Sequence, residues 1–250
     1  MTNSKHETEM SLQDNLTPQI GIPHPVTGLD MSVVSDARVA EALPQLLTEW
    51  RMKKRWDDMP PQTRALHQKL LIGYLTTGAP PGIAGLNPAI LEDLQQRDLI
   101  VLRDGALQSA YPFSTRKTGH KVRINGITNF CVCAIDALGA PAMAEKAAQV
   151  ALNCAVCDAA ITVRIGGAGL ELQQAAPKDA RIWAGIIPIK GCAADTQCQS
   201  MLAFCGDQHL NHWRGQQPGP TNGFAFSIAQ ALQAGAAIFR PFLQKGTAPT

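Results

Sequence analysis

The chain has 250 residues, of which 45% are hydrophobic and 17% are charged, so it can bury a sizeable core and is not disordered throughout. The net charge of +2 is spread without a long basic run, which gives no indication of nucleic acid or a membrane surface as a partner. No stretch approaches the roughly 20 apolar residues of a membrane span and residues 1–30 lack the apolar stretch of a secretory signal, so we expect a cytoplasmic protein.

Residues 1–34 mix Ser, Asn, Gln, Pro and charged residues with few regular apolar positions, which predicts a flexible N-terminal segment. From Ser35, a good N-cap residue, apolar side chains recur at helical spacing as far as Trp50 and predict one amphipathic helix. Four cations follow near the end of this helix. A helix C-terminus favours cations, which explains them without any ligand, and contact with phosphate is the alternative. These cations are Arg51, Lys53, Lys54 and Arg55.

Two more helices, over residues 63–74 and 88–96, precede a predicted hairpin over residues 99–111 with Asp104-Gly105 as its turn. Helices followed by such a hairpin are the order of a winged-helix unit. We therefore expect a helical, winged-helix-like domain over residues 35–115. Its third helix carries two acids and one Arg, which favours a structural domain over a DNA reader.

The second half of the chain changes to a strand pattern. Alternation from His120 around Asn125-Gly126 predicts a hairpin that leads directly into Cys131. Pro141 at a first helical position predicts an Ala-rich helix over Ala142–Leu152. Further strands are expected at 161–165, 170–172 and 182–189 and a last helix at 224–243, whereas 191–205 is ambiguous. The expected fold class is α+β, with residues 116–250 forming a mixed or antiparallel β-sheet domain flanked by helices.

Cys133 and Asp136 form the first candidate site. If Cys133 opens a helix, Asp136 lies three residues further on and on the same face. Thiolate is the reactive and metal-binding form of cysteine, and a desolvated carboxyl can hold a proton near neutrality. The pair suits chemistry that needs a soft nucleophile and a proton together. The alternative is that the cysteine is a small buried hydrophobe and Asp136 an acid at a helix start.

The seven cysteines are an odd number, and a reducing compartment would keep them as thiols unless they bind metal or do chemistry. Cys154 and Cys157 form a C-x-x-C pair that, with Cys131 and Cys133, could make a four-sulfur zinc site. A thioredoxin-type redox pair is the other possibility, but it would follow a strand and open a helix, whereas this pair follows the predicted Ala-rich helix.

His209 and His212 are three residues apart and could be metal ligands, with two surface histidines as the alternative. The chain has no phosphate-binding lysine loop, no G-x-G-x-x-G and no G-x-S-x-G, so phosphoryl transfer and serine hydrolysis lose support.

Residues 133–138, Cys-Ala-Ile-Asp-Ala-Leu, resemble the Cys-Ala-Leu-Asp-x-Leu motif of the organomercurial lyase (alkylmercury lyase) family with one conservative change. The likeness runs over about residues 80–244. Cys198 stands 15 residues before Trp213, at the distance of the second family cysteine from a Trp. Cys154 matches a further, structural cysteine, and the stretch from Gly223 to Arg240 resembles the last helix of the family.

The chain also departs from the family pattern. Gln199 stands where the family often has a second cysteine next to the one matched by Cys198. Cys131, Cys157 and Cys192 are extra thiols, and the first 35 residues lie outside the resemblance.

The resemblance implies that residues 116–250 are a catalytic domain that cleaves the carbon–mercury bond of small organomercurials in mercury detoxification, and that the winged-helix-like half belongs to the family fold. In this reading Cys133 and Cys198 bind mercury as thiolates. Asp136 belongs to the same mercury site and handles the proton that ends on carbon. The products are a hydrocarbon and bound Hg(II), which free thiols or a mercuric reductase would remove, and no organic cofactor is required. The alternatives are a non-catalytic soft-metal-binding protein and a winged-helix metal-responsive regulator.

Overall fold

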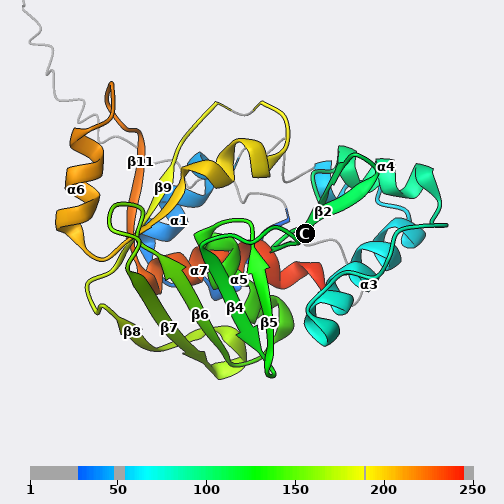
Figure 1. Cartoon of the computed structure of the whole chain (residues 1–250), viewed down its shortest axis with the longest axis horizontal. Coiled ribbons are helices and arrows are strands. Elements are labelled where there is room, and N and C mark those ends of the chain that lie inside the picture. The colour runs from blue at the N-terminus through cyan, green and yellow to red at the C-terminus, as the bar shows by residue number, and fades with distance from the viewer. Residues whose placement is uncertain (1–27, 48–53, 189, 245–250) are drawn as a thin grey trace, which may run out of the picture.

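The computed structural model describes residues 28–47, 54–188 and 190–244, and its largest element is an antiparallel sheet of eight strands in the order β1-β2-β3-β5-β4-β6-β7-β8 (Figure 1). These strands are β1 (Ile100–Arg103), β2 (Ala106–Ala110), β3 (Phe113–Ser114), β4 (His120–Ile124), β5 (Ile127–Cys131), β6 (Ala148–Asn153), β7 (Ala160–Gly166) and β8 (Glu171–Ala176). A smaller antiparallel sheet has the order β10-β9-β11, with β9 (Arg181–Gly185), β10 (Met201–Phe204) and β11 (Gly223–Ser227).

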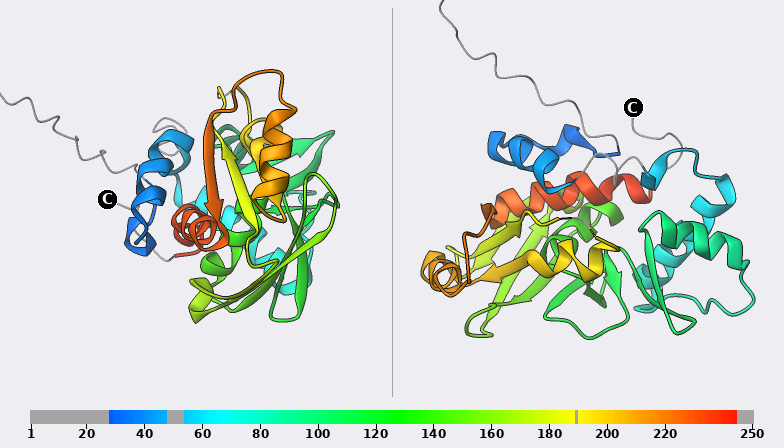
Figure 2. Two further views of the ribbon diagram at one scale, coloured as in Figure 1. Left: turned by 90° about the vertical axis from the view of Figure 1, so that its left-hand side faces the viewer. Right: turned by 90° about the horizontal axis from the view of Figure 1, so that it is seen from above.

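Helices cover these sheets in layers. The α-helices are α1 (Ala37–Leu46), α3 (Pro61–Thr77), α4 (Pro88–Gln96), α5 (Ala134–Ala144), α6 (Asp207–Gly215) and α7 (Ile228–Phe239). Short 3₁₀ turns are η1 (Met31–Val33), η2 (Gly167–Gly169), η3 (Ala193–Asp195), η4 (Gln197–Ser200) and η5 (Arg240–Phe242). Helix α5 packs on the large sheet, α7 packs on α5, and α1 lies against α7 (Figure 2). The α+β class with an antiparallel sheet, expected from the sequence, is confirmed.

Both predicted hairpins are present. Strands β1 and β2 are joined through Asp104-Gly105, and β4 and β5 through Asn125-Gly126. All four turn residues have positive φ, between 49° and 82°, which is the conformation that Asn-Gly and Asp-Gly pairs adopt in two-residue hairpin turns. The second hairpin delivers the chain through β5 to Cys133, the N-cap of α5.

Helix α5 is enclosed on all sides, because Ala134 to Met143 are all buried. Its closest neighbour is α7, and the two helices touch at a pair of glycines. A Cβ at Gly139 would lie 2.5 Å from the carbonyl oxygen of Gly235, and a Cβ at Gly235 would lie 2.8 Å from Cα of Gly139. Small residues therefore let the two helix backbones meet, and this contact fixes the position of α5.

The expected helix over Ala142–Leu152 is wrong. Pro141 lies inside α5 instead of opening a new helix, and α5 ends at Glu145, which has φ 51°. The next residues form β6, in which Ala148, Val150 and Leu152 face the core. The alanine content of this stretch favours a helix, but its buried and exposed positions alternate, which is the pattern of a strand with one face on the core.

The two ends of the described chain also differ in part from expectation. The stretch expected as one helix from Phe224 begins as strand β11, and only Ile228–Phe239 is α-helical. Residues 1–27 of the expected flexible segment lie outside the described residues, as do Trp50, Arg51 and Lys53. Residues 28–34 lie against α7, where Asp30 pairs with Arg240 at 2.6 Å. Within the described ranges, no helix is long and apolar enough to cross a membrane.

The glycine contact between α5 and α7 yields a stability prediction. Gly139→Ala places a methyl group against the backbone of α7 and should destabilise the fold by about 1–3 kcal/mol, as overpacking of a core usually does. Urea unfolding of the purified protein measures this.

Gly215→Ala is the matched control, because a Cβ there meets nothing within 4 Å and the change should be neutral or slightly stabilising. Equal stability of the two variants would show that α5 and α7 do not pack as closely as described.

Candidate active site

Three reactive side chains from two segments meet at the start of α5. Cys133 and Asp136 come from the first turn of this helix, and Cys198 comes from η4. Their two sulfur atoms and a carboxylate oxygen all lie within 4.8 Å of one another. Cys198 donates from Sγ to Asp136 Oδ2 at 3.7 Å. The structure thus brings together the three residues that the sequence singled out.

The position of Cys133 and Asp136 follows from helix capping. The backbone N–H of Asp136 donates to Cys133 Sγ at 3.4 Å, and the backbone N–H of Cys133 donates to Asp136 Oδ2 at 3.0 Å. This is a capping box in which a thiol replaces the usual hydroxyl. Two otherwise unpaired N–H groups of the helix start are satisfied, and the thiol and the carboxyl are held in fixed relative positions.

Burial controls the protonation of the carboxyl. Asp136 is only 4% exposed, and burial raises its pKa from 3.8 to about 7, against the hydrogen bonds with Cys133 and the attraction of Arg55, which lower it. Near neutral pH this carboxyl can therefore both accept and donate a proton.

The two thiols differ. Burial also raises the pKa of Cys133, although its hydrogen bond with Cys198 opposes the rise. The same hydrogen bond, followed by burial, raises the pKa of Cys198 well above its ordinary value. Both thiols are therefore protonated in the resting protein at neutral pH, and they differ in exposure, because Cys133 is buried and Cys198 is partly exposed.

A buried polar network holds the segment that leads to Cys198. Asp98 Oδ1 accepts from the backbone N–H of Ala193 at 3.0 Å, and the hydroxyl of Tyr111 accepts from the backbone N–H of Ala194 at 2.7 Å. Tyr111 donates in turn to Asp98 at 3.3 Å, and Arg55 pairs with Asp98 at 3.4 Å. The hairpin region of the first half of the chain therefore fixes residues that lie shortly before Cys198.

Sequence reasoning missed this network. It treated Arg55 as one of four cations near a helix end, whereas Arg55 is buried and pairs with a residue 43 positions away. An isolated Asp and an isolated Tyr carry no spacing signal for such a contact. Asp98 with φ 55° between α4 and β1 stands at a turn, which the sequence does not distinguish from an ordinary polar turn residue.

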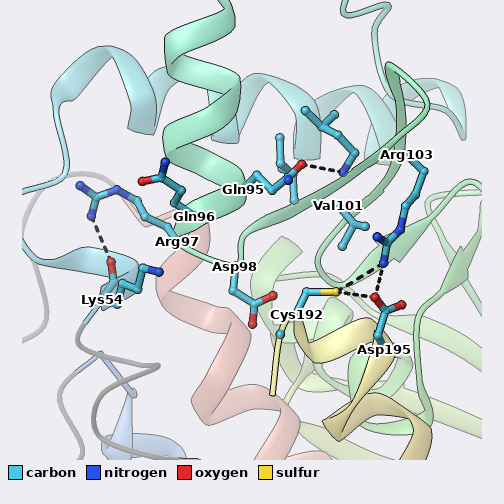
Figure 3. A pocket seen from close by; sticks show the side chains of 12 residues that line it. Lys54, Gln95, Gln96, Arg97, Asp98, Val101, Arg103, Cys192 and Asp195 are labelled. Atoms are coloured by element: carbon cyan, nitrogen blue, oxygen red, sulfur yellow. Dashed lines mark hydrogen bonds and ion pairs between the residues drawn. The ribbon is translucent and has the colours of Figure 1, made fainter. Parts of the chain in front are cut away.

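Asp98 also lines a cavity of about 470 Å³ (Figure 3). Cys192 lines it, and its Sγ donates to Asp195 Oδ2 at 3.2 Å, while Arg103 pairs with the same carboxylate. Burial raises the pKa of Cys192. The cavity thus lies beside the segment that leads from Cys192 to Cys198, six residues further along the chain.

The other cysteines that the sequence offered as metal ligands do not lie together in the structure. Cys131 is fully buried at the end of β5. The proposed four-sulfur zinc site is wrong, because Cys133 groups with Asp136 and Cys198, whereas Cys154 and Cys157 group with other residues described below. Gln199, in the place of the family's second adjacent cysteine, donates to the carbonyl of Ala194 at 2.7 Å.

Comparisons with known proteins bear on the fold and on the family of this chain. A search of curated proteins finds no match. Among solved structures, the mercury-bound form of MerB2 superposes with a TM-score of 0.66 at 20% identity, covering 82% of this chain and all of that one, which supports the fold. The family model for alkylmercury lyase matches residues 113–240, more than half of the chain, and this range includes Cys133, Asp136 and Cys198. The chain therefore belongs to the alkylmercury lyase family.

Proposed function

We propose that this protein cleaves the carbon–mercury bond of small organomercurials by protonolysis and retains Hg(II) on Cys133 and Cys198. The observation that carries the proposal is the meeting of two thiols and a carboxyl of raised pKa at one buried helix start. Mercury is a soft cation, and thiolate ligands select soft cations over oxygen and nitrogen ligands.

In the first step Cys133 binds the mercury of R-Hg⁺. Its thiol proton passes to the Asp136 carboxylate, which lies within the capping box and has a pKa of about 7. The product of this step is a Cys133-S-Hg-R adduct beside a protonated carboxyl. The substrate is then held with mercury close to Cys198 Sγ, because all three ligand atoms lie within 4.8 Å of one another.

In the second step Cys198 becomes the other sulfur ligand. Two thiolates increase the electron density on mercury and weaken its bond to carbon. The carbon leaves with the bonding electron pair and takes the proton of Asp136, while the proton of Cys198 passes to the carboxyl. Of the two thiol protons, one ends on the hydrocarbon and one leaves to solvent through Asp136. Mercury remains Hg(II) throughout, so no oxidant or reductant is consumed and no organic cofactor is required.

The first half of the chain has a structural part in this proposal. We propose that residues 35–115 form a winged-helix-like unit and residues 116–250 the catalytic unit, with residues 1–34 as a lead-in. Helices α3 and α4 pack on each other and precede the β1–β2 hairpin, in support of that arrangement. Through Asp98 and Tyr111 this unit holds the segment before Cys198. Its role in this proposal is to support the active site, and DNA binding is not needed to explain it.

The proposal extends to the fate of the product in the cell. A bis-thiolate Hg(II) exchanges with free thiols, so we propose a cytoplasmic enzyme that hands Hg(II) to small thiols or to a mercuric reductase. A protein that only stores or senses soft metal ions is the rival function, and it would bind Hg(II) without releasing hydrocarbon.

Replacement of the acid separates these two functions. Asp136→Asn keeps size and polarity but cannot take a thiol proton or give one to carbon, so hydrocarbon release should fall by about 10² or more. Hg(II) affinity should change little, because both thiols remain. Headspace gas chromatography with a methylmercury or phenylmercury substrate and excess thiol measures release, and Hg(II) competition on the same sample measures affinity. If Hg(II) affinity and hydrocarbon release fell together, Asp136 would only hold the two thiols in position and would not transfer the proton.

Removal of either sulfur ligand should abolish turnover. Cys133→Ala and Cys198→Ala each remove a soft ligand that no neighbouring oxygen replaces, while circular dichroism should show an intact fold. Cys192→Ser is the control and should lose less than about tenfold in rate, about 1.4 kcal/mol of barrier. Near-normal turnover in either alanine variant would contradict the assignment of the two mercury ligands.

The raised pKa of Asp136 predicts a pH-dependent stability difference. Because the folded-state pKa is about 7 and the unfolded value is 3.8, ionising Asp136 in the folded protein costs free energy that grows as pH rises between these values. Asp136→Asn removes this cost, so its stability relative to the parent protein should increase from pH 5 to pH 8. Urea unfolding at both pH values tests this, and a constant difference would show that Asp136 is ionised throughout.

A further inference from the structure

A second cluster of metal-ligand side chains lies outside the proposed active site and shares no residue with it. Cys154 directly follows β6 and Cys157 stands in the turn before β7, while Cys205 directly follows β10 and His209 belongs to the first turn of α6. One ligand atom from each of the four lies within 4.8 Å of those from the other three. The alkylmercury chemistry described above uses none of them.

The distances within the cluster suit tetrahedral coordination. Sγ of Cys157 and Sγ of Cys205 are 3.7 Å apart, and tetrahedral zinc with Zn–S bonds of about 2.3 Å places two sulfurs roughly 3.8 Å apart. Sγ of Cys154 and Nδ1 of His209 are 3.3 Å apart. Three sulfurs and one imidazole nitrogen therefore surround a point at which a small cation can reach all four.

The backbone holds the C-x-x-C segment in one tight turn. The N–H of Asp158 donates to the carbonyl of Cys154 at 2.9 Å, and the N–H of Cys154 donates to the carbonyl of Ala159 at 3.0 Å. Hydrogen bonds of the turn itself therefore fix the backbone that carries both sulfurs of the pair.

The spacing of the four residues is that of a structural zinc site. Cys154 and Cys157 form a C-x2-C pair, and Cys205 and His209 form a C-x3-H pair in a segment 48 residues further along. Structural zinc sites usually combine two such short pairs, and Cys₃His is one of their standard ligand sets.

We propose that Cys154, Cys157, Cys205 and His209 bind one Zn(II) as a structural site. Binding releases the three thiol protons to solvent and involves no change of oxidation state. All four coordination positions are then filled by protein, which leaves none for a substrate. The ion joins the turn between β6 and β7 to the junction of β10 and α6, where the N–H of Ala155 already donates to the carbonyl of Ala203 at 2.8 Å. Strand β10 begins just after Cys198 and ends just before Cys205, so the site also anchors the far end of the strand that follows the second mercury ligand.

Metal analysis of the full-length protein tests the proposal without any organomercurial. Protein purified under reducing conditions should contain about one zinc per chain by inductively coupled plasma mass spectrometry. After replacement by Co(II), it should show the intense visible absorption of tetrahedral cobalt together with sulfur-to-cobalt charge transfer. Cys157→Ser and His209→Ala should lose both signals, whereas His209→Cys, which supplies a fourth sulfur, should keep the zinc.

His212→Ala is the matched control, because His212 lies on the same helix but outside the cluster, and it should keep the zinc and the cobalt spectrum. The proposal is overturned if reduced parent protein binds neither zinc nor cobalt, or if Cys157→Ser and His209→Ala bind as much metal as the parent. It is also overturned if intact mass shows the loss of two hydrogens from a Cys157–Cys205 disulfide in place of the metal. The cobalt spectrum of the parent protein decides the matter even if a variant fails to fold. Because carbon–mercury cleavage is not measured, failure here leaves the proposed lyase activity to be judged by its own assays.

Discussion

The reciprocal hydrogen bonds between Cys133 and Asp136 are the interaction on which the rest of the site depends. They belong to the helix itself, because they satisfy N–H groups that every helix start leaves unpaired. A thiol and an acid are therefore placed side by side by the same contacts that begin α5. The cost is that the carboxyl is buried. Burial raises its pKa, and a raised pKa is what a proton-transferring carboxyl needs.

This arrangement works only if α5 cannot move. The helix is buried along its length, and the Gly139–Gly235 contact sets its distance from α7. Cys198 must then be brought to α5 from a separate segment of short turns. The buried Asp98 and Tyr111 hold the backbone of Ala193 and Ala194, so the first half of the chain supports a site to which it contributes no ligand. We infer that the two halves are coupled through this contact.

Some parts of this structure were predictable from sequence because their causes are local. The turns at Asp104-Gly105 and Asn125-Gly126 require positive φ, which these residue pairs adopt readily, so both hairpins were correctly expected. That Cys133 opens a helix was a condition of the argument for the Cys133–Asp136 pair, and α5 meets this condition. Strand β6 was not predictable, because its alanines favour a helix locally and only pairing with β4 and β7 makes it a strand.

The two cysteine clusters show the same division. Cys133 and Asp136 are three residues apart, and helical geometry alone unites them. The assignment of Cys198 needed the resemblance to a known family, because no rule of spacing connects residues 62 positions apart. For the C-x-x-C pair, Cys154 and Cys157, the sequence predicted the wrong partners. Cys131 and Cys133 are nearer to it along the chain than Cys205 and His209. Sheet topology, not distance along the chain, determines which pairs meet.

The most direct test of the central claim is a single turnover in heavy water. Methylmercury, reacted with the reduced protein in D₂O, should release methane that carries one deuterium, because the acidic thiol and carboxyl protons exchange with solvent before one of them reaches carbon. One Hg(II) per chain should remain bound at Cys133 and Cys198. Retention of intact methylmercury on the protein, with no methane released, would contradict protonolysis and leave a mercury-binding protein.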